Sequence, residues 1–265
     1  SSTNSPLATG DWYKIGITST GIQKLNKSFF LDNGIPISNI NPKNIRIFGY
    51  AEGMLSEDAT SGTPLSIPEI PIHFEGSNDG IFNTSDYLLF FAKAANVWEW
   101  DQTQKEYNHE KHLYTDTVFY YINIDTDEGK RIQIVNESTL PSTNSVLTYE
   151  NHQFHELDKY NLIKTGRQWF GEPFDLSNGL TQSFNFSFPN KAAEEKIHIK
   201  TRIGVRSTTS YNNNFVIKAN GTTIKTSANA SKTSSSYTAQ YVMILNDMDS
   251  FDLTSSNLNL SFGIP

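Results

Sequence analysis

The fold is decided by the stretch Phe215-Val-Ile-Lys-Ala-Asn-Gly-Thr-Thr-Ile224. Phe215, Ile217 and Ala219 alternate with other side chains up to the Asn220-Gly221 pair, and a threonine-rich run follows. Asn-Gly between alternating runs is a strong hairpin signal, because a type I′ turn needs positive φ at both central positions. The stretch therefore predicts two antiparallel strands joined by a two-residue turn.

The same alternation continues on both sides of this hairpin. Apolar residues recur at every second position, which is typical of half-buried antiparallel strands. Several strands at this spacing predict a jelly-roll-like β-sandwich over residues 146–265, and the chain stops directly after a strand, so we expect the closing strand to be missing. The alternating sets are Phe184/Phe186/Phe188, Ile197/Ile199/Ile203/Val205, Tyr237/Ala239/Tyr241/Met243/Leu245 and Leu258/Leu260/Phe262.

The part before residue 140 has a mixed pattern. Thr117–Ile124 is apolar on both faces and predicts a strand buried on both sides, and Arg131–Val135 also reads as a strand. Helical spacing of apolar residues over Thr20–Asn33, with Gly34 at the expected stop, predicts a short helix. Residues 1–140 are therefore predicted to be a mixed β module with one or two short helices, joined to the sandwich by a polar linker, Asn136–Ser145. The fold class is mainly β.

Composition and charge argue against several classes of function. The chain has 265 residues, a formal net charge of −7 and no cysteine. An acidic balance argues against nucleic-acid binding, and no apolar run approaches the length of a membrane span, so direct membrane insertion is not expected. The absence of cysteine removes disulfides, thiolate metal sites and a cysteine nucleophile from these residues. Because Ser1–Thr9 has neither a basic start nor an apolar stretch, we expect any export signal to have been removed already.

One loop carries oxygen side chains at calcium-loop spacing. With Gly80 as position 6 of a twelve-residue loop, such side chains fall at positions 1, 3, 5, 9 and 12. The length of the first acid, an aspartate at position 12 and strand-like flanks depart from the pattern. Two interpretations stay open, a calcium site and an Asp-Gly turn between strands. The candidate calcium ligands are Glu75, Ser77, Asp79, Asn83 and Asp86.

Three tryptophans suggest a different site. Trp98 and Trp100 lie two apart, so on a strand they project from the same side, and Trp169 precedes Phe170. Such rings either form a platform for sugar rings or pack in a core. A carbohydrate-binding module and a calcium-stabilised adhesion-type domain are therefore alternative functions. Enzymatic activity of this chain is not expected, because the sequence has no Gly-x-Ser-x-Gly elbow, phosphate loop or dinucleotide fingerprint.

An ordered set of short phrases carries a family resemblance over nearly the whole chain. Together they resemble the N-terminal, non-catalytic region of PorU-type sortases, the gingipain-like cysteine peptidases of the type IX secretion system. The phrases are Trp12-Tyr-Lys-Ile-Gly-Ile17, Gly21-Ile-Gln-Lys-Leu25, Asn41-Pro-Lys-Asn-Ile-Arg-Ile-Phe-Gly49, Asp79-Gly-Ile-Phe82, Asp86-Tyr-Leu-Leu-Phe-Phe-Ala92, Tyr114-Thr-Asp-Thr-Val-Phe-Tyr120 and Gly166-Arg-Gln-Trp-Phe-Gly-Glu172.

The resemblance implies an exported protein at the cell surface, associated with the outer membrane. Proteins of this family remove a sorting domain from secreted cargo, and their catalytic cysteine and histidine lie in a downstream caspase-like domain. No catalytic residue is carried over onto this chain, which has no cysteine. The implied role is a scaffold that packs on the downstream peptidase domain of the same polypeptide or on an outer-membrane β-barrel partner.

Overall fold

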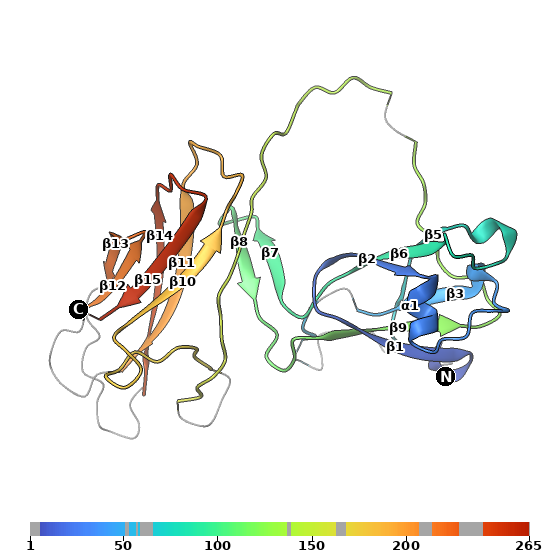
Figure 1. Ribbon diagram of the computed structural model, residues 1–265, viewed down its shortest axis with the longest axis horizontal. Coiled ribbons are helices and arrows are strands. Elements are labelled where there is room, and N and C mark those ends of the chain that lie inside the picture. Colours follow the sequence, from blue (N-terminus) through green and yellow to red (C-terminus); the bar gives the residue numbers. More distant parts are fainter. Residues whose placement is uncertain are drawn as a thin grey trace. The chain divides into compact units, whose positions relative to one another are not determined.

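The computed structural model describes residues 6–50, 53–56, 58, 66–136, 139–162, 168–206, 214–227 and 241–264. The chain divides into two compact units, Ser1–Thr143 and Asn144–Pro265. The predicted fold class is confirmed, since strands dominate both units (Figure 1). Among the described residues α1 (Lys27–Asp32) is the one α-helix, and short 3₁₀ turns occur at Pro6–Ala8 (η1), Pro42–Asn44 (η2) and Ser77–Asp79 (η3). In these ranges no helix is long and apolar enough to cross a membrane.

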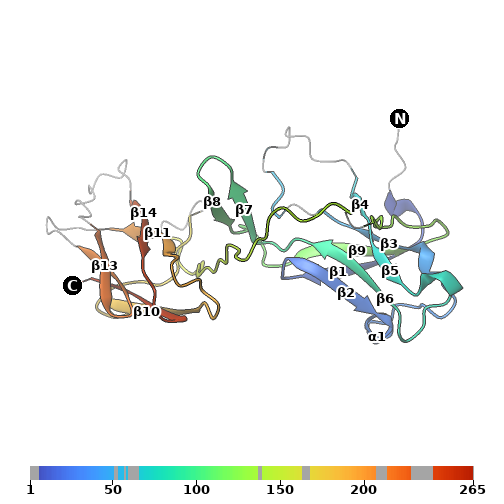
Figure 2. The ribbon, with the colours of Figure 1, turned by 90° about the horizontal axis from the view of Figure 1, so that it is seen from above.

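The first unit contains two antiparallel sheets, both visible in Figure 2. One sheet has the order β1–β9–β3–β4, and the other the order β2–β6–β5. A separate hairpin is formed by β7 and β8. The strands are β1 (Asp11–Ile17), β2 (Gly21–Asn26), β3 (Ile45–Phe48), β4 (Glu69–Ile70), β5 (His73–Glu75), β6 (Tyr87–Ala92), β7 (Val97–Asp101), β8 (Glu106–Glu110) and β9 (Val118–Ile124).

Both sheets of the first unit contribute to one hydrophobic core. Ile47 and Ile122 come from one sheet and Leu88 and Phe90 from the other, and all four are fully buried. β9 is paired on both edges, with β1 and β3, as its apolar sequence suggests. Its outer face is less covered than predicted, because Phe119 is 42% exposed. Burial on both faces thus holds for only part of this strand.

The segment after Thr20 differs from its predicted helix. Gly21–Asn26 forms β2, which pairs with β6, and the helix is confined to Lys27–Asp32. Pairing with the apolar strand β6 overrides the helical spacing, and Ile22 is left 64% exposed instead of facing a core. Asn26 caps the helix, because its side chain accepts the Phe29 N–H at 3.0 Å.

The second unit has the hairpin that the sequence predicts. β12 (Phe215–Ala219) and β13 (Thr222–Ser227) pair through a turn with φ of 46° at Asn220 and 84° at Gly221. Their sheet has the order β10–β15–β12–β13, with β10 at Thr181–Ser187 and β15 at Asn257–Gly263. β11 (Ile197–Val205) pairs with β14 (Met243–Phe251) in a second sheet. Tyr237 and Ala239, at the start of the third alternating set, lie outside the described residues.

The predicted strand at Arg131–Val135 is wrong. Arg131 forms a single bridge with Ile72, and the Ile132 N–H donates to the Ile72 carbonyl at 3.0 Å. The chain then leaves the sheet, and Ile134 and Val135 are 86% and 82% exposed. Residues 141–159 likewise form no strand or helix.

Candidate functional site

The calcium-like loop connects β5 to β6 in the first unit. Glu75 ends β5 and lies 3.3 Å from the Nε2 atom of His73, and η3 covers Ser77–Asp79. The Asp79 carboxylate accepts the Ile81 N–H at 3.0 Å and the Asn83 side-chain amide at 2.8 Å. These are the bonds of an Asx-type turn, in which an aspartate satisfies the backbone of its own loop.

Asp86 lies at the end of the same loop and accepts hydrogen bonds from it. Its side chain accepts the Asn83 N–H at 2.7 Å and the Ser85 hydroxyl at 3.3 Å, and the residue is only 6% exposed. Gly76 makes room for it, because a Cβ at this glycine would lie 2.2 Å from Asp86 Oδ1. Among the described residues no three acidic or histidine side chains cluster to hold a metal. Calcium binding by this loop therefore stays a prediction.

The tryptophans fall in both units. Trp98 and Trp100 lie on one face of the β7–β8 hairpin, opposite His109 and Tyr107, with ring-centroid distances of 4.9 and 5.1 Å. These cross-strand ring pairs stabilise the hairpin itself. Trp169 belongs to the second unit and is 45% exposed. The structure thus brings two of the three rings together on one hairpin face, and a sugar platform remains a prediction.

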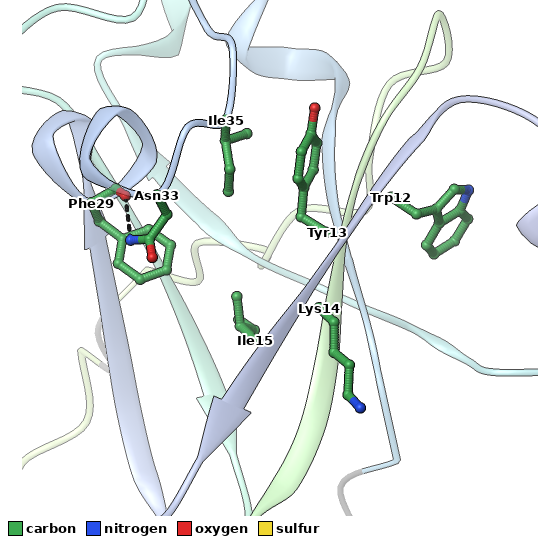
Figure 3. A pocket seen from close by; sticks show the side chains of 7 residues that line it. All are labelled: Trp12, Tyr13, Lys14, Ile15, Phe29, Asn33 and Ile35. Atoms are coloured by element: carbon green, nitrogen blue, oxygen red, sulfur yellow. Dashed lines mark hydrogen bonds between the residues drawn. The ribbon is translucent and has the colours of Figure 1, made fainter.

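Sequence reasoning missed a hollow beside β1. Figure 3 shows Tyr13 and Ile15 of β1 facing it together with Phe29 of α1 and Ile35, while Trp12 and Lys14 extend to the other side of the strand. The hollow has a volume of about 290 Å³. Tyr13 has a raised pKa because of burial and the nearby Asp11 carboxylate. The sequence shows that these residues are apolar or aromatic, but it does not show that they lie together. Grouping them requires the positions of β1 and α1 in the fold.

A second hollow lies under the loop after β3. It has a volume of about 460 Å³ and is lined largely by apolar groups, among them Met54, Leu55 and Phe119. His112 also lines it, and its Nδ1 atom accepts the Tyr114 N–H at 3.1 Å. The hydroxyl of Thr115 bonds with the backbone of Thr117. The His112 ring and the Thr115 hydroxyl therefore bond to the backbone of their own segment.

Hydrogen bonds of Arg131 join the chain after β9 to the sheet. The Arg131 guanidinium donates to the carbonyls of Pro42, Lys43 and Ile45, at 3.2, 2.7 and 3.4 Å. Burial lowers the pKa of Arg131. These bonds fasten the chain after β9 to η2 and β3, so this arginine has a structural role.

The fold and the composition together define a mainly β module without cysteine. No protein-family model matches the sequence, and no curated protein matches it either. Among solved structures the fold is similar to the crystal structure of dimeric latent PorU from Porphyromonas gingivalis, with a TM-score of 0.78 and 20% sequence identity. The similarity covers 98% of this chain, which spans 23% of the length of that chain. At this identity the similarity establishes a PorU-like fold.

Proposed function

We propose that this chain is the non-catalytic accessory region of a cell-surface, gingipain-like cysteine endopeptidase, the sortase type of the type IX secretion system. The observation that carries the proposal is the match of 98% of the chain to 23% of a PorU chain. A match of that extent is expected when a whole region of a longer protein is shared. The motif phrases of the sequence, taken in their order, support the same assignment.

The chemistry of the chain supports a scaffold role. A cysteine peptidase needs a thiolate nucleophile beside a base, and this chain has no cysteine. The half-buried Arg131 side chain instead joins segments of the fold through its bonds to the carbonyls of Pro42 and Lys43. The chain would hold the downstream peptidase domain in place, or dock it to an outer-membrane barrel, in an exported protein at the cell surface.

The reading frame beyond Pro265 tests this proposal. We expect it to encode an α/β domain with a histidine and a cysteine that together cleave peptide bonds. Deleting residues 1–265 from that polypeptide should lower the melting temperature of the peptidase domain, because its docking surface would then be exposed to water. A stop codon after Pro265 would exclude the accessory role, and a peptidase domain whose stability is unchanged by the deletion would exclude packing on that domain.

A further inference from the structure

Strand β11 of the second unit carries basic side chains on one side. Every second residue of the strand faces away from the core, and His198, Lys200 and Arg202 occupy three of these positions and are all exposed. The intervening residues Ile197 and Ile199 pack against the hydrophobic core instead. The whole chain has a formal net charge of −7, so this side of β11 is opposite in sign to the molecule as a whole.

The neighbouring strand β14 adds no acid to this side. Residues directly opposite each other in an antiparallel pair share one side of the sheet. The residues opposite the three basic ones are uncharged, namely Ser250, Met248 and Asn246. The two acids of β14, Asp247 and Asp249, lie on the other side, where they contact Lys225 of β13. The outer side of the strand pair, defined by these three basic and three uncharged residues, is called the basic face below.

The composition of the basic face favours a protein as its partner. None of its six residues is a tryptophan, tyrosine or phenylalanine, whose rings stack on sugars and nucleobases and anchor proteins at membrane surfaces. Met248 is 57% exposed and lies directly opposite Lys200. Arginine and methionine are both enriched where proteins contact each other.

We propose that the basic face binds an extended acidic segment of a partner protein, with aspartate or glutamate at every second position. Alternate side chains of a strand lie about 6.8 Å apart, so a segment that runs along β11 presents one carboxylate to each basic group. The guanidinium of Arg202 is suited to a carboxylate because it donates two parallel hydrogen bonds. The inference concerns residues of the second unit alone and does not depend on a peptidase domain after residue 265.

Fluorescence anisotropy of labelled peptides mixed with chain 1–265 tests the basic face. The probe is a capped peptide as long as β11 in which glutamate and threonine alternate, and its control has glutamine in place of glutamate. The glutamate peptide should bind at least tenfold more tightly than the glutamine peptide. Added salt should weaken its binding, because salt screens exposed charges.

Two double variants locate the binding. Lys200→Glu/Arg202→Glu should weaken binding of the glutamate peptide at least tenfold, and a thermal melt shows whether this variant is folded. Lys200→Gln/Arg202→Gln removes the same charges without reversing them and should bind with intermediate affinity. The matched control Lys105→Glu/Lys218→Glu makes the same change in net charge at exposed positions outside the basic face, and it should weaken binding less than threefold.

The other outcomes overturn the proposal. Equal affinity for the glutamate and glutamine peptides would show that the basic face does not recognise carboxylates. Equal losses in the two charge-reversal variants would assign the binding to net charge instead of to this face. Tighter binding of the chain to polygalacturonate or to phosphatidylglycerol vesicles than to the glutamate peptide would identify a polysaccharide or a membrane as the partner.

Discussion

The guanidinium of Arg46 donates to the carboxylate of Glu69 across a distance of 2.8 Å. The other oxygen of the same carboxylate accepts the Lys130 N–H at 2.6 Å. Arg46 belongs to β3 and Glu69 to β4, whereas Lys130 lies in the chain that follows β9. One carboxylate therefore joins three segments that are far apart in the sequence. It lies at the sheet edge formed by β4, the strand with the shortest pairing in this sheet.

Replacing this carboxylate should destabilise the first unit. Glu69→Ala leaves the partly buried Arg46 without its partner and the Lys130 N–H without its acceptor, so we expect a loss of about 1.5–3 kcal/mol in the free energy of unfolding. Urea denaturation measures this loss. Glu194→Ala, at an exposed position, should change the free energy by less than about 0.5 kcal/mol. Equal effects of the two variants would refute the role assigned to Glu69.

The same carboxylate predicts a pH dependence. Burial raises the pKa of Glu69, but the bonds from Arg46 and the Lys130 N–H outweigh it, and the pKa in the folded state lies below the ordinary value of 4.5. The stability that Glu69 contributes is therefore fully present above pH 4.5 and is lost as the pH falls through the lower folded pKa. The difference in stability between wild type and Glu69→Ala should accordingly shrink on acidification. A difference that stays constant down to pH 2 would contradict this linkage.

The hydroxyl group of Tyr120 should contribute to the stability of the first unit. The side chain is fully buried, and its oxygen accepts the Lys93 N–H at 2.9 Å and lies 3.3 Å from the Tyr50 carbonyl. Tyr120→Phe keeps the ring but removes the acceptor, which should cost about 1–3 kcal/mol in thermal or urea unfolding. The control is Tyr13→Phe, since Tyr13 is only half-buried on β1. A Tyr120→Phe protein as stable as wild type would show that the hydroxyl bonds contribute nothing.

In the second unit, Lys225 should stabilise two acids on the core side of β14. Its Nζ atom lies 3.2 Å from Asp249 and 3.7 Å from Asp247, and Asp247 also accepts the Ser227 hydroxyl. The bond with Asp249 raises the pKa of Lys225, so its contribution is present below its ordinary pKa of 10.5 and is lost as the pH rises through the higher folded value.

Lys225→Met should therefore lower the melting temperature at pH 7, by an amount that diminishes at strongly alkaline pH. Differential scanning calorimetry measures the shift. Lys218→Met, at an exposed position on the neighbouring strand β12, should melt close to wild type. If both variants melt alike, the Lys225 contacts are not stabilising.

Calcium provides a direct test of the loop between β5 and β6. Of the two interpretations of this loop, the Asp-Gly turn predicts that millimolar calcium leaves the melting temperature unchanged, because Asp79 and Asp86 already accept N–H groups of their own loop. A ligand of the folded state would instead raise the melting temperature by mass action. A rise that Asp79→Asn abolishes would establish the calcium site that the spacing predicts.

Local signals predicted the elements whose partners are close in sequence. The Asn220-Gly221 turn needs only the φ values that these two residues tolerate, and the hairpin forms as expected. Gly34, with φ of 68°, ends the segment that contains α1 as the sequence indicated.

Elements that depend on distant partners were harder to predict. Gly21–Asn26 is a strand because β6 lies beside it, and nothing within these six residues encodes that neighbour. Arg131–Val135 has a strand-like sequence but meets only Ile72. The hollow beside β1 combines residues from β1, α1 and the chain that follows α1, and a grouping of that kind emerges only from tertiary packing.

Peptidase activity shows directly whether the groups that cleave peptide bonds lie outside residues 1–265. Chain 1–265 and the full polypeptide that continues beyond Pro265 should be compared on a secreted substrate that carries its C-terminal sorting domain. We expect cleavage by the full polypeptide and none by the isolated chain, at any pH or calcium concentration. Cleavage by the isolated chain would contradict this expectation.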